Sequence, residues 1–215
     1  MVLSLVIITY IILMMLIKLI ILTLMTNQLY PKTVIPESIK NEIETALSFY
    51  PELKDTAINF EFKKNIKKST MQAQPTASSF LKRRGQRSYN IFISETVKIS
   101  GEVLYTVDMP QEVLIGWIGH ELGHVMDYKN RSNLNLMWFG VKYLLSDNHI
   151  ATAERAADTY AVQSGMEQYI LKTKDFILSQ ANLEQSYIAR IKKYYLSPEE
   201  IMEIINQRDA NLSES

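Results

Sequence analysis

The chain has 215 residues, 47% of them hydrophobic, and its 23 basic and 23 acidic residues give a formal net charge of zero. This composition excludes a disordered tail or a collagen-like rod, and it gives no electrostatic reason to expect a nucleic-acid partner. The absence of cysteine excludes disulfides, thiolate zinc sites and a cysteine nucleophile, and leaves three histidines for metal binding: His120, His124 and His149.

Residues 2–25 are almost entirely Leu, Ile, Val and Met. As a helix, this segment would be about 36 Å long, and the hydrocarbon core of a bilayer is about 30 Å thick. It lacks the basic start, the short apolar stretch and the small residues at the cut that are typical of a cleaved signal peptide. We therefore predict a transmembrane anchor over residues 1–26 and a single-pass protein that binds the lipid bilayer through residues 2–25. The few nearby basic residues leave the side of the membrane open.

Two prolines in residues 27–36 predict a linker, and we predict that residues 37–215 form one domain. Apolar residues at spacings of three and four predict a helix over residues 39–50. Alternation of apolar and polar residues predicts short strands farther along the chain. The predicted strands are residues 56–62, 89–94 and 102–107.

Residues 63–87 are predicted to be a long polar loop, which contains lysines and arginines but no acidic residue. On a membrane-bound chain, such a basic stretch can contact anionic lipid head groups. A solvated loop whose charge is balanced elsewhere is the simpler interpretation. Aromatic residues are sparse in this stretch, which argues against nucleic-acid binding.

From residue 110 onward the pattern is helical. Ser197 and Glu200 have the spacing of a capping box, in which each side chain satisfies a backbone N–H of the other residue. The order of helix, short strands and then helices predicts an α+β fold that is rich in helix. The predicted helices cover residues 110–129, 134–145, 149–164, 167–194 with room for one break, and a last segment that starts at residue 197.

The segment His120-Glu-Leu-Gly-His124 is an HExxH motif inside one of these helices. Residues four apart lie above one another on a helix, so both imidazoles can bind one Zn²⁺. Glu121 can contact a water on the open side of the metal and accept its proton. The alternative is two ordinary histidines on a helix face beside a solvated glutamate.

A zinc site needs a third protein ligand, and two candidates lie downstream. His149 is a free imidazole that no periodic pattern ties to the motif. Glu154 shares a helix face with Asp158, four residues later, among several alanines that allow another helix to approach. Glu154 could therefore bind the metal while Asp158 accepts a hydrogen bond from a ligand histidine. The alternative is a pair of surface charges beside Arg155.

The motif His120-Glu-Leu-Gly-His124 followed by Glu154-Arg-Ala-Ala-Asp158 resembles the gluzincin metallopeptidases, most closely the group of HtpX and the CAAX prenyl proteases. The resemblance implies that His120, His124 and Glu154 bind one zinc ion, that Glu121 is the general base, and that Asp158 orients a ligand. It also implies a small sheet packed on the HExxH helix and the following ExxxD helix. Members of that group have several membrane spans, so their substrates are not carried over to this chain.

We therefore predict a membrane-anchored zinc metallopeptidase that acts on a peptide or protein substrate. Hydrolysis also needs a donor for the charge that develops on the carbonyl oxygen, and His149, Tyr160 and Tyr128 are candidates by their proximity in sequence alone. The alternative function is a non-catalytic metal-binding or partner-binding domain of the same fold, tethered to the membrane. The sequence gives no indication of the oligomeric state.

Overall fold

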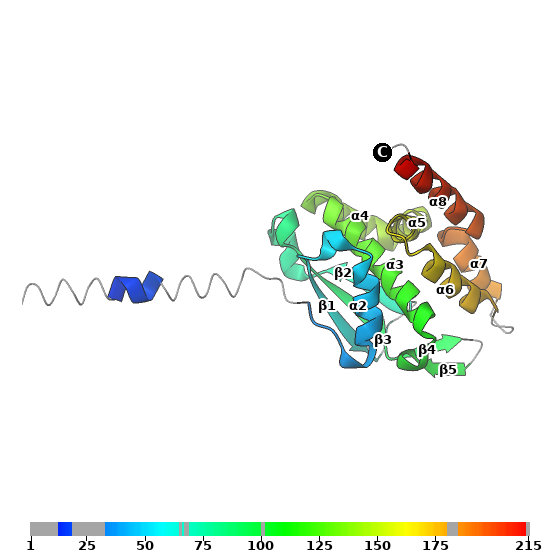
Figure 1. Ribbon diagram of the computed structural model, residues 1–215, viewed down its shortest axis with the longest axis horizontal. Coiled ribbons are helices and arrows are strands. Elements are labelled where there is room, and N and C mark those ends of the chain that lie inside the picture. Colours follow the sequence, from blue (N-terminus) through cyan, green and yellow to red (C-terminus); the bar gives the residue numbers. More distant parts are fainter. Residues whose placement is uncertain are drawn as a thin grey trace, which may run out of the picture. The chain divides into compact units, whose positions relative to one another are not determined.

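The computed structural model describes residues 13–18, 33–64, 66, 69–99, 102–179 and 185–213 (Figure 1). The chain divides into two compact units, Met1–Lys32 and Thr33–Ser215. The elements described below belong to the second unit, which contains the predicted metal ligands.

The predicted membrane anchor is wrong. Among the residues that the structure describes, no helix is long and apolar enough to cross a membrane. Within the predicted anchor, the described helix covers residues 13–18. The rest of that prediction falls outside the described residues. The fold class is corrected to a helix-rich protein with a small sheet, and the single-pass membrane localisation is not supported.

Five strands form two small sheets in the described part of the second unit. In the first sheet, β3 lies in the middle, parallel to β1 and antiparallel to β2, so that β2 is an edge strand. In the second sheet, β4 and β5 form an antiparallel pair. The strands are β1 (Ala57–Lys63), β2 (Met71–Pro75), β3 (Ser88–Ser94), β4 (Thr96–Ile99) and β5 (Glu102–Tyr105).

Helices make up most of the remaining regular structure. The α-helices are α2 (Lys40–Ser48), α3 (Gln111–Asn130), α4 (Asn133–Leu145), α5 (Asp147–Gln163), α6 (Glu167–Ser179), α7 (Gln185–Tyr194) and α8 (Pro198–Ser213). The short 3-10 helices are η1 (Glu37–Ile39), η2 (Pro51–Leu53), η3 (Ala77–Leu81), η4 (Arg84–Gln86) and η5 (Thr106–Asp108).

The core lies around α3, which runs between the three-stranded sheet with α2 on one side and α5 with α6 on the other (Figure 1). Alternate residues of β3, Tyr89, Ile91 and Ile93, are buried on the face of the sheet that belongs to the core. On α3, almost every side chain from residue 113 to 128 is buried. A helix enclosed in this way can hold polar groups in a water-poor environment, which is the setting in which the HExxH motif lies.

Glycines on α3 determine how closely α5 and α6 approach it. A Cβ atom at Gly123 would lie 2.3 Å from the carbonyl oxygen of Ala157 on α5. A Cβ atom at Gly116 would lie 2.4 Å from the carbonyl oxygen of Tyr169 on α6. Both neighbours are backbone atoms that cannot turn away, so these two helix contacts require glycine.

Most predicted elements are confirmed. However, β4 was not predicted, and the predicted strand 102–107 ends at Tyr105, directly before η5. The predicted loop 63–87 contains β2, whose Met-Gln-Ala-Gln-Pro sequence has weak strand propensity and whose pairing depends on the edge of β3. The predicted helix 167–194, for which one break was allowed, is described as two helices, α6 and α7. The predicted capping box is confirmed: the backbone N–H of Ser197 donates to Glu200 Oε2 at 2.8 Å, and that of Glu200 donates to Ser197 Oγ at 3.3 Å.

We expect Gly123→Ala to lower the free energy of unfolding by about 1–3 kcal/mol, the usual cost of overpacking a core. Gly140→Ala on α4 is the matched control, because a Cβ atom there meets nothing within 4 Å. That variant should gain roughly 0.5–1 kcal/mol, since glycine is unfavourable inside a helix. Urea unfolding measures both values. Equal stability of the two variants would contradict the proposed packing constraint.

Candidate metal centre

Three buried side chains from two helices form a group that could hold a metal ion. His120 and His124 lie one turn apart on α3, and Glu154 lies on α5. One ligand atom from each residue lies within 4.8 Å of the other two. The i and i+4 spacing places both imidazoles on the face of α3 that packs against α5. The group therefore exists because these two helices are in contact.

The ligand atoms of these three side chains lie close to one another. Glu154 Oε2 lies 3.0 Å from His120 Nε2 and 3.5 Å from His124 Nε2. The two imidazole rings are nearly perpendicular, with centroids 4.8 Å apart. Two neutral nitrogens and one carboxylate oxygen are a donor set that suits a divalent transition metal.

Asp158, one turn after Glu154 on α5, holds the ring of His120. The Nδ1–H of His120 donates to Asp158 Oδ1 at 2.9 Å, so that Nε2 faces Glu154. The other carboxylate oxygen, Oδ2, accepts from Lys174 Nζ at 2.8 Å and from the backbone N–H of Leu196 at 3.0 Å. A carboxylate that fixes the orientation and tautomer of a ligand histidine is a common feature of metal sites.

Two tyrosines contact the other two ligands, Glu154 and His124. The Tyr143 hydroxyl of α4 donates to Glu154 Oε1 at 2.8 Å, which leaves Oε2 directed at the histidines. The Tyr128 ring stacks on His124 at a centroid distance of 5.9 Å and an interplanar angle of 18°. His124 Nδ1 is buried and has no hydrogen-bond partner among the described residues.

The ionisable side chains of the group change one another's pKa. Burial lowers the pKa of His120, but the hydrogen bonds and charges of Asp158 and Glu154 outweigh burial and raise this pKa to about 10. Burial raises the pKa of Glu154, but the two histidines outweigh burial and hold this pKa well below its usual range. Without a metal, a proton on His120 therefore compensates the carboxylates. A divalent cation would take the place of that proton.

Glu121 lies beside the group on the same helix, and the edge strand of the sheet positions it. Its Oε2 accepts the backbone N–H of Ala73 on β2 at 2.6 Å. Burial raises the pKa of Glu121, which the nearby histidines and the Ala73 N–H partly offset. A carboxyl with a raised pKa next to a metal-binding group is suited to accept a proton.

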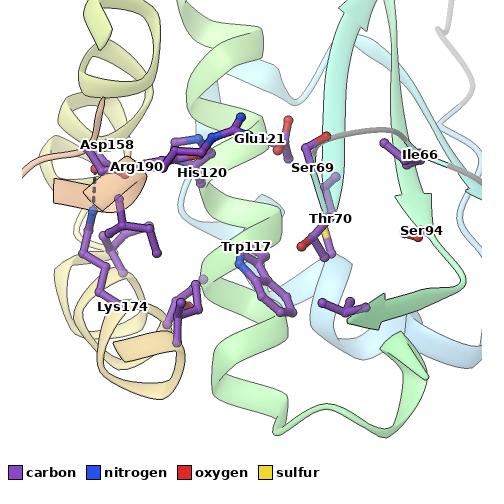
Figure 2. Close-up of a pocket in the computed structure, with 18 of the residues that line it drawn as sticks. Ile66, Ser69, Thr70, Ser94, Trp117, His120, Glu121, Asp158, Lys174 and Arg190 are labelled. Carbon is purple, nitrogen blue, oxygen red and sulfur yellow. Dashed lines mark hydrogen bonds and ion pairs between the residues drawn. The ribbon is translucent and has the colours of Figure 1, made fainter. Parts of the chain in front are cut away.

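A cavity of about 760 Å³ opens beside the group (Figure 2). His120 and Glu121 form part of its wall, together with Asp158 and Lys174 on the helical side. The cavity extends between α6 and α7 on that side and β2, β4 and β5 on the strand side. Its other side chains include the apolar residues Trp117, Ile170, Ile177 and Ile191 and a group of hydroxyl side chains, Ser69, Thr70, Ser94 and Thr96.

The other predicted site residues, His149 and Tyr160, lie on α5, the helix that carries Glu154. His149 lies in the first turn of α5, where its Nδ1 is buried without a partner among the described residues. The Tyr160 hydroxyl accepts a hydrogen bond from Asn130 Nδ2 at 3.0 Å. Neither residue lines the cavity in the described part of the chain.

Several residues of the site were not predicted, and two of them carried a signal. Lys174 occupies the buried face of α6 with Ile170, Thr173 and Ile177, where a lysine needs a partner. Tyr143 follows the buried Leu136 and Phe139 at helical spacing on α4, so its hydroxyl points inward. Arg190 and Tyr195 also line the cavity, but no pattern in the sequence marked them.

No protein-family model matches the chain, and comparisons with curated proteins and with solved structures give no significant match. The resemblance to gluzincins therefore rests on the two motifs and stays a prediction.

We expect the purified chain to bind one divalent metal ion, and His124→Ala or Glu154→Ala to abolish this binding because each variant removes one of three ligands. His149→Ala is the control, since it removes an imidazole outside the group. Metal content by elemental analysis after dialysis measures the result. Loss of the ion in His149→Ala with retention in His124→Ala would contradict this assignment.

We expect Tyr143→Phe to weaken metal affinity roughly tenfold, because residues that orient ligands typically contribute 10–100-fold. The variant keeps the ring and removes only the hydroxyl that donates to Glu154. Tyr160→Phe removes a hydroxyl that bonds to Asn130 and should leave the affinity unchanged. Competition with a chromophoric chelator measures both constants, and equal affinities in the two variants would exclude this role of Tyr143.

Proposed function

We propose that the chain is a zinc-dependent peptidase in which His120, His124 and Glu154 hold the ion and Glu121 is the general base. The observation that carries this proposal is the buried His-His-Glu group with a second glutamate beside it in the wall of a cavity. Tetrahedral zinc ligands with bonds of about 2.0–2.1 Å lie roughly 3.3 Å apart. The distances from Glu154 Oε2 to the two histidines, 3.0 and 3.5 Å, fit this spacing.

When bound, zinc supplies a Lewis acid that lowers the pKa of a water molecule to about 7. The residues of the chain then have separate tasks. Asp158 keeps the Nε2 of His120 directed at the ion, and Tyr143 does the same for Oε2 of Glu154. Glu121 accepts the proton from the attacking water and passes it to the leaving amine. The Ala73 N–H holds Glu121 Oε2, which leaves Oε1 for the water.

The residues that line the cavity favour a peptide as the substrate. Its apolar walls suit a large apolar side chain next to the bond that is cleaved. Arg190 brings a guanidinium to the same cavity, and no ion pair ties it to a carboxylate among the described residues (Figure 2). We assign Arg190, in place of His149 or Tyr160, as the donor to the carbonyl oxygen on which negative charge develops.

We expect Glu121→Gln to retain zinc and to lose peptidase activity by about 10²–10⁴-fold, the usual contribution of a general base. Glu112→Gln is the matched control on the same helix, because Glu112 is an exposed residue paired with Lys172. Cleavage of casein or a peptide library, with zinc content measured in parallel, gives the comparison. If the unmodified chain binds zinc and cleaves no peptide, the alternative of a non-catalytic metal-binding domain is favoured.

A further inference from the structure

The helix α4 exposes an apolar surface that the proposed peptidase function does not explain. Of its thirteen residues, Leu136 and Phe139 are buried, whereas Leu144 is 83% and Leu134 74% exposed. The helix contains no acidic residue. The large apolar side chains that it exposes are Leu134, Met137, Trp138, Val141, Leu144 and Leu145. An exposed apolar surface of this extent normally marks a contact with a partner or a membrane.

A cationic segment borders the start of α4. Asn133 Nδ2 donates to the carbonyl oxygens of Phe80 at 3.0 Å and Lys82 at 3.1 Å, which places η3 against the first turn of the helix. Leu81, between these two residues, is 93% exposed. The next residues, Lys82, Arg83 and Arg84, are exposed and form no ion pair within the described part of the chain. The exposed cationic residues therefore follow a backbone segment that contacts the first turn of α4.

We propose that this surface, formed by α4 and residues 81–84, binds the surface of an anionic lipid bilayer. The combination matches the physics of an interfacial helix: apolar side chains enter the boundary of the acyl chains, and lysines and arginines bind anionic head groups. Thirteen helical residues span about 20 Å, so α4 lies in the plane of the interface and does not cross the bilayer. Trp138 lies among the exposed residues, and tryptophan favours this boundary.

The charge distribution favours lipid over a second copy of the chain. In a symmetric dimer through this surface, the partner contributes the same surface, so that no acidic residue of it can pair with Lys82, Arg83 and Arg84. The structure provides no acidic residue in α4 or in residues 77–87 to compensate them. An anionic bilayer supplies the opposite charge and the apolar phase together.

Trp138 provides a local measurement in the full-length chain. Trp117 is the only other tryptophan, so Trp117→Phe leaves Trp138 as the sole source of indole fluorescence. With vesicles of phosphatidylglycerol and brominated phosphatidylcholine, we expect the emission to move to shorter wavelength and to be quenched by bromine. Because the quencher acts at short range, binding of any other segment to the vesicle does not reproduce this result.

Three variants in the Trp117→Phe background separate the contributions. Leu144→Glu should remove most of the quenching. Met202→Glu, which also places a glutamate at an exposed apolar position but on α8, should leave the quenching unchanged. Replacing Lys82, Arg83 and Arg84 with glutamine should also reduce the quenching. Circular dichroism checks that each variant is folded, and none of these residues is buried.

The proposal is overturned if Trp138 is not quenched by the anionic vesicles. It is also overturned if vesicles of phosphatidylcholine alone quench Trp138 equally, because the cations would then have no role. A shift to shorter wavelength that appears without vesicles and grows with protein concentration would instead assign this surface to contact between two copies of the chain.

Discussion

The contact between α3 and α5 is the constraint on which the metal centre depends. The two histidines are on one helix and the carboxylates of Glu154 and Asp158 are on the other, so the group exists only while the helices are close. Gly123 makes this possible, because any side chain there would meet the backbone of Ala157. The absence of a Cβ atom at one position therefore determines the geometry of ligands on two helices that lie thirty or more residues apart in the sequence.

Near this contact, Asp158 forms hydrogen bonds to more segments of the fold than any of the three ligands does. Its two oxygens bind His120 of α3, Lys174 of α6 and the backbone N–H of Leu196 before α8. A buried carboxylate is costly unless it is paired, and three donors compensate this one. Burial raises the pKa of Asp158, but His120 and Lys174 outweigh burial and hold this pKa low. The same interactions that keep Asp158 ionised also orient the ring of His120.

The helix α4 connects the two halves of the centre and faces two environments. Its inner side carries Tyr143, which binds Glu154, and its outer side carries the exposed apolar residues. In the proposed lipid contact, one short helix would therefore link a membrane surface to a ligand of the metal. Among the described helices, the cavity is lined by α3, α5, α6 and α7, so α4 does not line the space assigned to substrate.

Local pattern and tertiary packing contributed differently to what could be predicted. The helical spacing of His120 and His124, the shared face of Glu154 and Asp158, and the capping box at Ser197 depend on neighbours within one turn, so they could be read from the residues themselves. The apolar run 2–25 predicted a membrane-spanning helix from hydropathy alone, and no helix among the described residues is long and apolar enough to cross a membrane. In the same way, the weak strand propensity of residues 71–75 hid β2, because the edge of β3 supplies its hydrogen bonds.

The sequence alone determined which residue types and helical faces are available for metal binding, because the α-helix repeats with a fixed period. Only the tertiary structure decided that Glu154 and not His149 joins the two histidines, that Ala73 holds Glu121, and that Lys174 and Tyr143 hold the carboxylates. These contacts join segments between 11 and 48 residues apart. Their distances depend on how closely whole helices and strands pack. Local periodicity in the sequence carries no information about these packing distances.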